Sequence, residues 1–146
     1  MNLASHMKIL LVEDDEGHAM LVQMNLREAG LDNAIDHVTD GEAALDYVKN
    51  AVANDQASLL ILLDLNLPVM DGYGVLENLK SNDATRKIPV VVLTSTDDAN
   101  EIDRCYELGC NVYLRKPVAY DDFVSAIKQL GLFLSVVELP GKYGKR

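Results

Sequence analysis

Polar side chains follow four apolar runs of the sequence, at the point where each run ends. Glu13 and Asp14 follow the first of these runs, Asp64 the second, Thr94 the third and Lys116 the last. If the runs are parallel strands, their carboxyl ends lie about 5 Å apart at one edge of a sheet. Three carboxylates placed there repel one another, and a divalent cation would relieve that repulsion. Oxygen ligands alone favour Mg²⁺, with Mn²⁺ or Ca²⁺ as alternatives, over Zn²⁺. The lysine and the hydroxyl suit a phosphoryl group.

Helix capping is the competing interpretation, because acidic residues at strand ends often begin turns and cap helices. We favour capping for Asp15, Glu16 and Asp71. Capping explains Asp64 poorly, since this carboxylate directly follows five apolar residues, where the loss of hydration is costly. The sequence therefore indicates a cation and phosphoryl site rather than a set of caps.

The elements that must position these side chains alternate along the chain. Apolar runs predict strands over 8–12, 34–39, 58–63, 88–93 and 111–114. Apolar periodicity and stop signals predict helices over 16–29, 42–50, 73–79, 99–108 and 120–130. On the first helix, the residues expected to face the core are Met20, Leu21, Met24 and Leu26. Five strand-then-helix units with short links predict an α/β domain whose parallel sheet carries helices on both faces.

The composition excludes several classes of protein. The 146 residues suit one domain, and 13 basic against 23 acidic residues, a net charge of −10, argue against direct binding to nucleic acid. No apolar run approaches the length of a membrane span, and no secretory signal opens the chain. We expect Cys105 and Cys110 to stay reduced in a cytoplasmic protein. We interpret residues 1–6 as an expression-vector remnant, with the natural start at Met7.

Four sequence blocks, taken in order, resemble the signature of response-regulator receiver domains. They are LVED at 11–14, LLDLNLPVMDG at 62–72, LTS at 93–95 and YLRKP at 113–117. The resemblance covers residues 7–134 and leaves 135–146 as a C-terminal tail. It implies a flavodoxin-like, doubly wound (βα)5 fold with the strand order 2-1-3-4-5.

The spacing of the key residues is also similar to that of receiver domains. Asp64 stands 30 residues before Thr94 and 52 before Lys116, as in the family. It stands 50 residues after Asp14, a few more than in the most compact members.

The resemblance implies a role for each acidic residue. Asp64 matches the aspartate that accepts a phosphoryl group from a sensor histidine kinase. Asp14, Asp64 and the backbone carbonyl of Asn66 match direct Mg²⁺ ligands, with Mn²⁺ as the alternative ion. Glu13 matches the other position of the acidic pair, where a carboxylate often acts through water.

The resemblance also implies a switch that responds to phosphorylation. Lys116 and Ser95 would bind the phosphoryl oxygens, and the peptide before Pro117 is expected to be cis. Thr94 would turn its hydroxyl to the new phosphate, and Tyr113 would turn inward with it. The change would reach the surface formed by the fourth helix, the fifth strand and the fifth helix.

The lifetime of the phosphorylated state is expected to depend on two neighbouring positions. Asn66 and Thr96 each stand two residues after a key residue and would flank the path of the attacking water. An acidic or amide residue in place of Thr96 would orient that water better, so we predict moderate to slow self-dephosphorylation.

The leading hypothesis is a stand-alone regulator that signals by protein contact or passes its phosphoryl group onward. Segment 132–140 is apolar for a tail, so it is expected to pack on the domain or to contact a protein, with a homodimer preferred. The block at 62–68, the long loop after the second helix and the ending VELP at 137–140 resemble single-domain regulators paired with bacterial phytochrome kinases. The other expected partner is a downstream protein target or a phosphotransfer protein.

Two alternatives remain open. The first is a Mg²⁺-dependent phosphatase with Asp64 as nucleophile, although Asn66 stands where such an enzyme would carry a general acid. The second is a receiver fragment of a longer regulator. His18 and His37 lie outside the four blocks, and neither is expected to act as a phosphorelay histidine.

Overall fold

The structure is a computed structural model that describes residues 7–28, 30–54, 58–95, 97–116, 121–122, 125–126 and 128. Several predictions fall outside these residues: the vector remnant over 1–6, the peptide before Pro117, the tail over 135–146 and most of the helix over 120–130. Within the described ranges, every helix falls short of the length and apolarity that crossing a bilayer requires.

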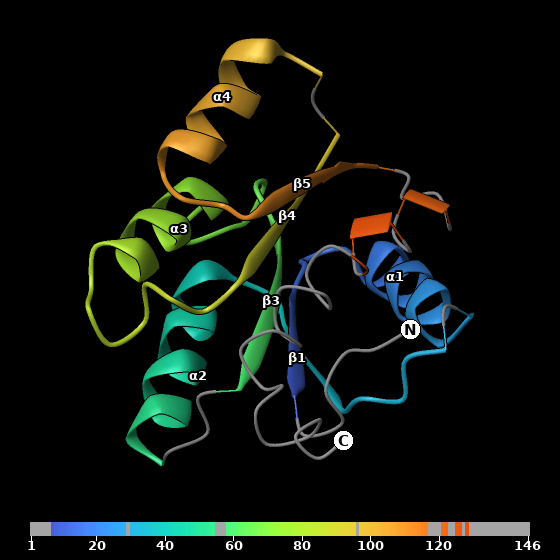
Figure 1. Ribbon diagram of the computed structural model, residues 1–146, viewed down its shortest axis with the longest axis horizontal. Coiled ribbons are helices and arrows are strands. Elements are labelled where there is room, and N and C mark those ends of the chain that lie inside the picture. Colours follow the sequence, from blue (N-terminus) through green and yellow to red (C-terminus); the bar gives the residue numbers. More distant parts are fainter. Residues whose placement is uncertain are drawn as a thin grey trace, which may run out of the picture.

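Five strands form one parallel sheet in the order β2-β1-β3-β4-β5 (Figure 1). They are β1 (Lys8–Val12), β2 (Ile35–Val38), β3 (Leu59–Asp64), β4 (Val90–Thr94) and β5 (Val112–Arg115). All six residues of the central strand β3 are buried, as a strand covered on both faces requires. The predicted fold class and strand order are confirmed.

Helices cover both faces of the sheet (Figure 1). Helix α1 (Glu16–Glu28) lies on one face, where Ala126 joins the same apolar cluster. Helices α2 (Gly41–Ala53), α3 (Gly72–Lys80) and α4 (Ala99–Glu107) lie on the other. Alternate strand residues point into these two cores, so Leu62 packs with α1 and Leu63 packs with the other helices.

Most element boundaries lie within one residue of the sequence prediction, and two differ by more for physical reasons. Helix α2 continues past Asn50 to Ala53, because Ala51 still packs in the core. Strand β4 begins at Val90 rather than Ile88. Pro89 precedes it and has no N–H group to donate to a ladder, although its carbonyl accepts a hydrogen bond from Ile61.

The predicted inward face of α1 is wrong in three of its four residues. Leu26 is buried, but Met20, Leu21 and Met24 are between 53% and 63% exposed. The buried face consists instead of Ala19, Val22 and Leu26, which follow the helical spacing of three and four residues. The sequence prediction favoured Met20, Leu21 and Met24, whereas the face that meets the sheet carries Ala19, Val22 and Leu26.

The loop between β3 and α3 is fixed closely against α2. A Cβ atom at Gly41 would collide with the backbone of Met70, so only glycine permits this approach. Asp71 caps α3 by accepting from the N–H of Gly74, which confirms its interpretation as a cap. Val69 has a φ of 69°, and the N–H of Met70 donates across it to the carbonyl of Pro68 at 2.7 Å. The loop that follows Asp64 therefore has a defined but locally strained path.

Candidate functional site

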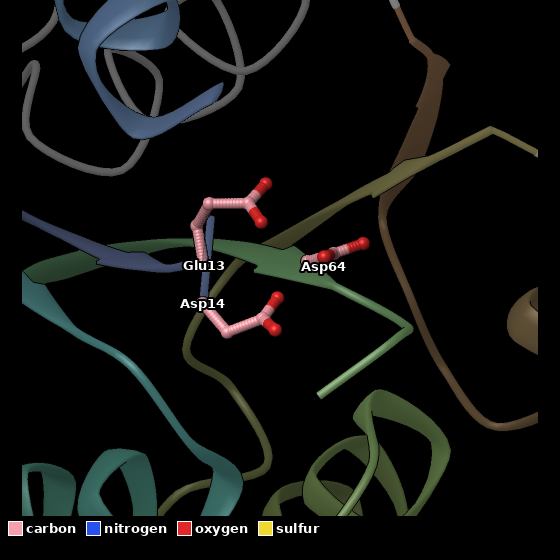
Figure 2. Close-up of side chains that lie close together, drawn as sticks. All are labelled: Glu13, Asp14 and Asp64. Atoms are coloured by element: carbon pink, nitrogen blue, oxygen red, sulfur yellow. The ribbon is translucent and has the colours of Figure 1, made fainter. Parts of the chain in front are cut away.

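The three acidic residues meet where β1 and β3 end. Val12 pairs with Leu63 in neighbouring parallel strands, so Glu13 and Asp14 emerge beside Asp64. One carboxylate oxygen from each residue lies within 4.8 Å of the other two. Figure 2 shows the three carboxylates gathered at this edge of the sheet. The strand register thus brings together residues that stand 50 positions apart.

Lys116 supplies the positive charge of the cluster. Its Nζ lies 2.6 Å from Glu13 Oε1 and 3.3 Å from Asp64 Oδ2. The backbone N–H of Lys116 donates to the backbone carbonyl of Thr94 at 2.7 Å, which fixes the end of β5 against the end of β4. Glu13 is fully buried, and its second carboxylate oxygen accepts from the N–H of Asp15 at 3.1 Å. Glu13 and Lys116 therefore form a buried ion pair next to Asp64.

Burial dominates the electrostatics of Asp64. The residue is 3% exposed, and loss of hydration raises the pKa of its carboxyl from 3.8 to about 6. Lys116 acts in the opposite direction and lowers this pKa, while the negative charge of Glu13 raises it again. A carboxylate in this position gains from any further cation that approaches it.

The three carboxylates suit a hard divalent cation. Asp14 is exposed while Glu13 and Asp64 are buried, so the cluster is open on one side only. Asp14, Asn66 and Ser95 line a pocket of about 610 Å³ together with Asp64 and Lys116. The ligand atoms are all oxygens, which Mg²⁺ and Mn²⁺ prefer. The open side leaves room for water and for a phosphoryl oxygen beside the ion.

The remaining predicted residues differ in how they lie relative to this pocket. Ser95 lines it, whereas Thr94 is 2% exposed at the end of β4. Tyr113 is half-buried on β5, with its ring edge-on to Tyr106 of α4 at 5.8 Å between centroids. Thr96 lies outside the described residues.

Sequence reasoning missed two histidines near the site. His18 lines the same pocket, with its Nδ1 4.0 Å from Glu13 Oε1. His37 Nε2 lies 2.7 Å from the backbone carbonyl of Glu13. The position of His18 one turn after the acidic pair could have indicated the first contact. The second contact follows only once β2 is known to pair with β1.

Comparison with known proteins links this geometry to one family. The model of the response regulator receiver domain matches residues 9–128. Rcp1 from Synechocystis is 38% identical over 135 residues, which cover 90% of this chain and 92% of Rcp1.

Three solved structures are similar to this chain. A receiver domain from Rhodospirillum rubrum is 50% identical with a TM-score of 0.70, over 88% of this chain and 94% of that one. The Mn²⁺-bound form of Rcp1 has 36% identity and a TM-score of 0.69, over 85% and 91%. The phosphorylated cyanobacterial phytochrome response regulator RcpA has 36% identity and a TM-score of 0.72, over 87% and 94%. The resemblance to receivers, including those associated with phytochromes, is confirmed.

Proposed function

Because the chain belongs to the response regulator receiver domain family, we propose that it accepts a phosphoryl group on Asp64 from a histidine kinase. The observation that carries this proposal is the buried Asp64 carboxylate, which lies 3.3 Å from Lys116 and beside Glu13 and Asp14. The phosphatase alternative finds no support, since Asn66 cannot donate a proton as a carboxylic acid would.

Transfer of the phosphoryl group needs an ionised Asp64 as nucleophile and positive charge to neutralise the phosphoryl oxygens. An oxygen of Asp64 attacks phosphorus, the P–N bond to the kinase histidine breaks, and its electron pair returns to the imidazole nitrogen. Lys116 favours the ionised form of Asp64, because its charge lowers the pKa of that carboxyl. Asp14, Asp64 and the backbone carbonyl of Asn66 would hold Mg²⁺, which neutralises charge on the phosphoryl oxygens. Mn²⁺ is the alternative ion, as in the Mn²⁺-bound structure of Rcp1.

The signal would leave the site through β4 and β5. Lys116 and Ser95 bind phosphoryl oxygens in this proposal, and Thr94 turns its hydroxyl toward them. The hydrogen bond from Lys116 to the carbonyl of Thr94 supports a joint movement of these two strand ends. Tyr113 contacts Tyr106, so its inward turn would change the surface of α4 and β5. That surface would then bind a downstream protein.

The partners are proposed from the relatives. RcpA is a phytochrome response regulator, which supports a phytochrome kinase as the phosphoryl donor. A stand-alone regulator is favoured because the match to Rcp1 extends over 92% of that protein. We further propose a cytoplasmic homodimer that acts on a downstream target or a phosphotransfer protein.

Phosphoramidate tests this function directly, because its P–N bond is of the same kind as that of phosphohistidine. The protein is incubated with phosphoramidate and Mg²⁺, and its intact mass is measured. The wild type is expected to gain one phosphoryl group, whereas Asp64→Asn and a sample with excess EDTA are expected to gain none. Equal labelling of the wild type and Asp64→Asn would contradict the proposal. After removal of the donor, the half-life of the phosphorylated protein should be longer than seconds.

A further inference from the structure

The main chain of Glu13 is attached to the edge strand β2 at two points. Its N–H donates to the carbonyl of Val38 at 3.1 Å, which continues the ladder between β1 and β2. Its carbonyl oxygen lies 2.7 Å from Nε2 of the His37 ring. A carbonyl oxygen only accepts hydrogen bonds, so Nε2 is the donor whether the ring is neutral or charged. A side chain of β2 thus adds a contact to Glu13, which stands just beyond the end of β1.

The bonded carbonyl belongs to the peptide group that joins Glu13 to Asp14. Rotation of this peptide would turn the following residue and move its carboxylate relative to Asp64. Asp14 is exposed and stands in the bend between β1 and α1, so surrounding side chains constrain it less than they constrain Glu13. Among the contacts described above, the hydrogen bond from His37 is the one that acts directly on this peptide.

We propose that His37 is a positioning residue for the divalent-cation site. Its Nε2–H group fixes the peptide between Glu13 and Asp14 and thereby places the Asp14 carboxylate beside that of Asp64. This inference rests on the proposed function, in which Asp14, Asp64 and the backbone carbonyl of Asn66 hold Mg²⁺. Loss of a group that hydrogen-bonds and orients a metal ligand typically weakens metal binding about 10-fold or more. Loss of the His37 side chain is therefore expected to raise the dissociation constant for the metal about 10-fold.

Binding of Mn²⁺ alone provides a readout that is independent of phosphorylation. Free Mn²⁺ is measured by electron paramagnetic resonance during titration of the full chain. His37→Ala is expected to raise the dissociation constant about 10-fold. His37→Gln is expected to restore it to within about threefold, because a glutamine Nε2–H can occupy a position close to that of the ring donor. His37→Leu keeps side-chain bulk without a donor and should behave like His37→Ala, so it replaces that variant if the alanine protein does not fold.

Tyr47→Phe is the matched control. Tyr47 Oη donates to Asp36 Oδ2 at 2.6 Å, so this substitution also removes a side-chain hydrogen bond of β2, next to His37 but without contact to Glu13. Its Mn²⁺ affinity should equal that of the wild type, even if its thermal midpoint falls as far as that of His37→Ala.

A second readout separates positioning from general damage. With phosphoramidate, His37→Ala should need about 10-fold more Mg²⁺ for half-maximal labelling but reach the wild-type rate at saturating Mg²⁺. The inference is wrong if wild type and His37→Ala bind Mn²⁺ equally, if Tyr47→Phe binds as weakly as His37→Ala, or if His37→Gln restores nothing. A wild-type protein that binds no Mn²⁺ would instead contradict the metal site of the proposed function.

Discussion

Removal of the Asp64 charge is expected to stabilise the fold in the absence of divalent ions. Burial raises the pKa of this carboxyl from 3.8 to about 6. As the pH rises from 3.8 to 6, the unfolded chain releases this proton first, so the folded state loses stability and the full loss is present above pH 6. The shift corresponds to about 3 kcal/mol. At pH 7.5, the free energy of unfolding of Asp64→Asn should therefore exceed that of the wild type by about 3 kcal/mol.

The assay is urea unfolding followed by far-ultraviolet circular dichroism in EDTA, between pH 4 and 8. The advantage of Asp64→Asn should shrink to about 0.5 kcal/mol near pH 4, where Asp64 is protonated in the folded state and about half ionised in the unfolded state. Addition of Mg²⁺ at about 10 times its dissociation constant should return about 1.4 kcal/mol to the wild type and less to the variant. Asp83→Asn is the control, because the Asp83 side chain is 97% exposed and its removal should change the free energy of unfolding far less. An Asp64→Asn protein no more stable than the wild type at pH 7.5, or an advantage independent of pH, would refute this reasoning.

Three further substitutions test other parts of the structure by urea unfolding. Val69→Gly should stabilise the fold by about 1 kcal/mol, since the exposed valine has a φ of 69° that glycine adopts without strain. Gly41→Ala should destabilise it by about 2 kcal/mol, because the new methyl group meets the Met70 backbone. Lys116→Met should destabilise it by about 3 kcal/mol, since Glu13 then stays buried without its cation. An unchanged free energy of unfolding for Lys116→Met would contradict the ion pair described there. An increase for Gly41→Ala would contradict its close approach to Met70, and a decrease for Val69→Gly would contradict the backbone strain at Val69.

The sheet and its acidic edge could be predicted because their signals are local. Five apolar residues followed by Asp64 define both a buried strand and the charge at its end. The alternation of strands and helices predicts a parallel sheet, and parallel strands bring their carboxyl ends together. The strand order came from the resemblance to receiver domains, since no single segment encodes it.

Features that depend on packing between segments could not be predicted. On α1, apolar residues stand on two faces of the helix, and only its orientation on the sheet determines that Val22 is buried while Met20 and Met24 are exposed. The contact between His37 and Glu13 requires the β1–β2 register. The closer approach of Lys116 to Glu13 than to Asp64 depends on the relative positions of three strand ends. The roles given to the individual site residues, from Asp64 and Lys116 to Thr96 and Tyr113, stay predictions.

Location of the phosphoryl group tests the central claim most directly. After incubation with phosphoramidate and Mg²⁺, borohydride reduces an aspartyl phosphate to homoserine, and peptide mass spectrometry then identifies the modified position. The proposed function predicts homoserine at Asp64 and an unmodified Asp14, with no conversion when EDTA is present. Conversion at another residue, or a labelled protein with Asp64 intact, would contradict it.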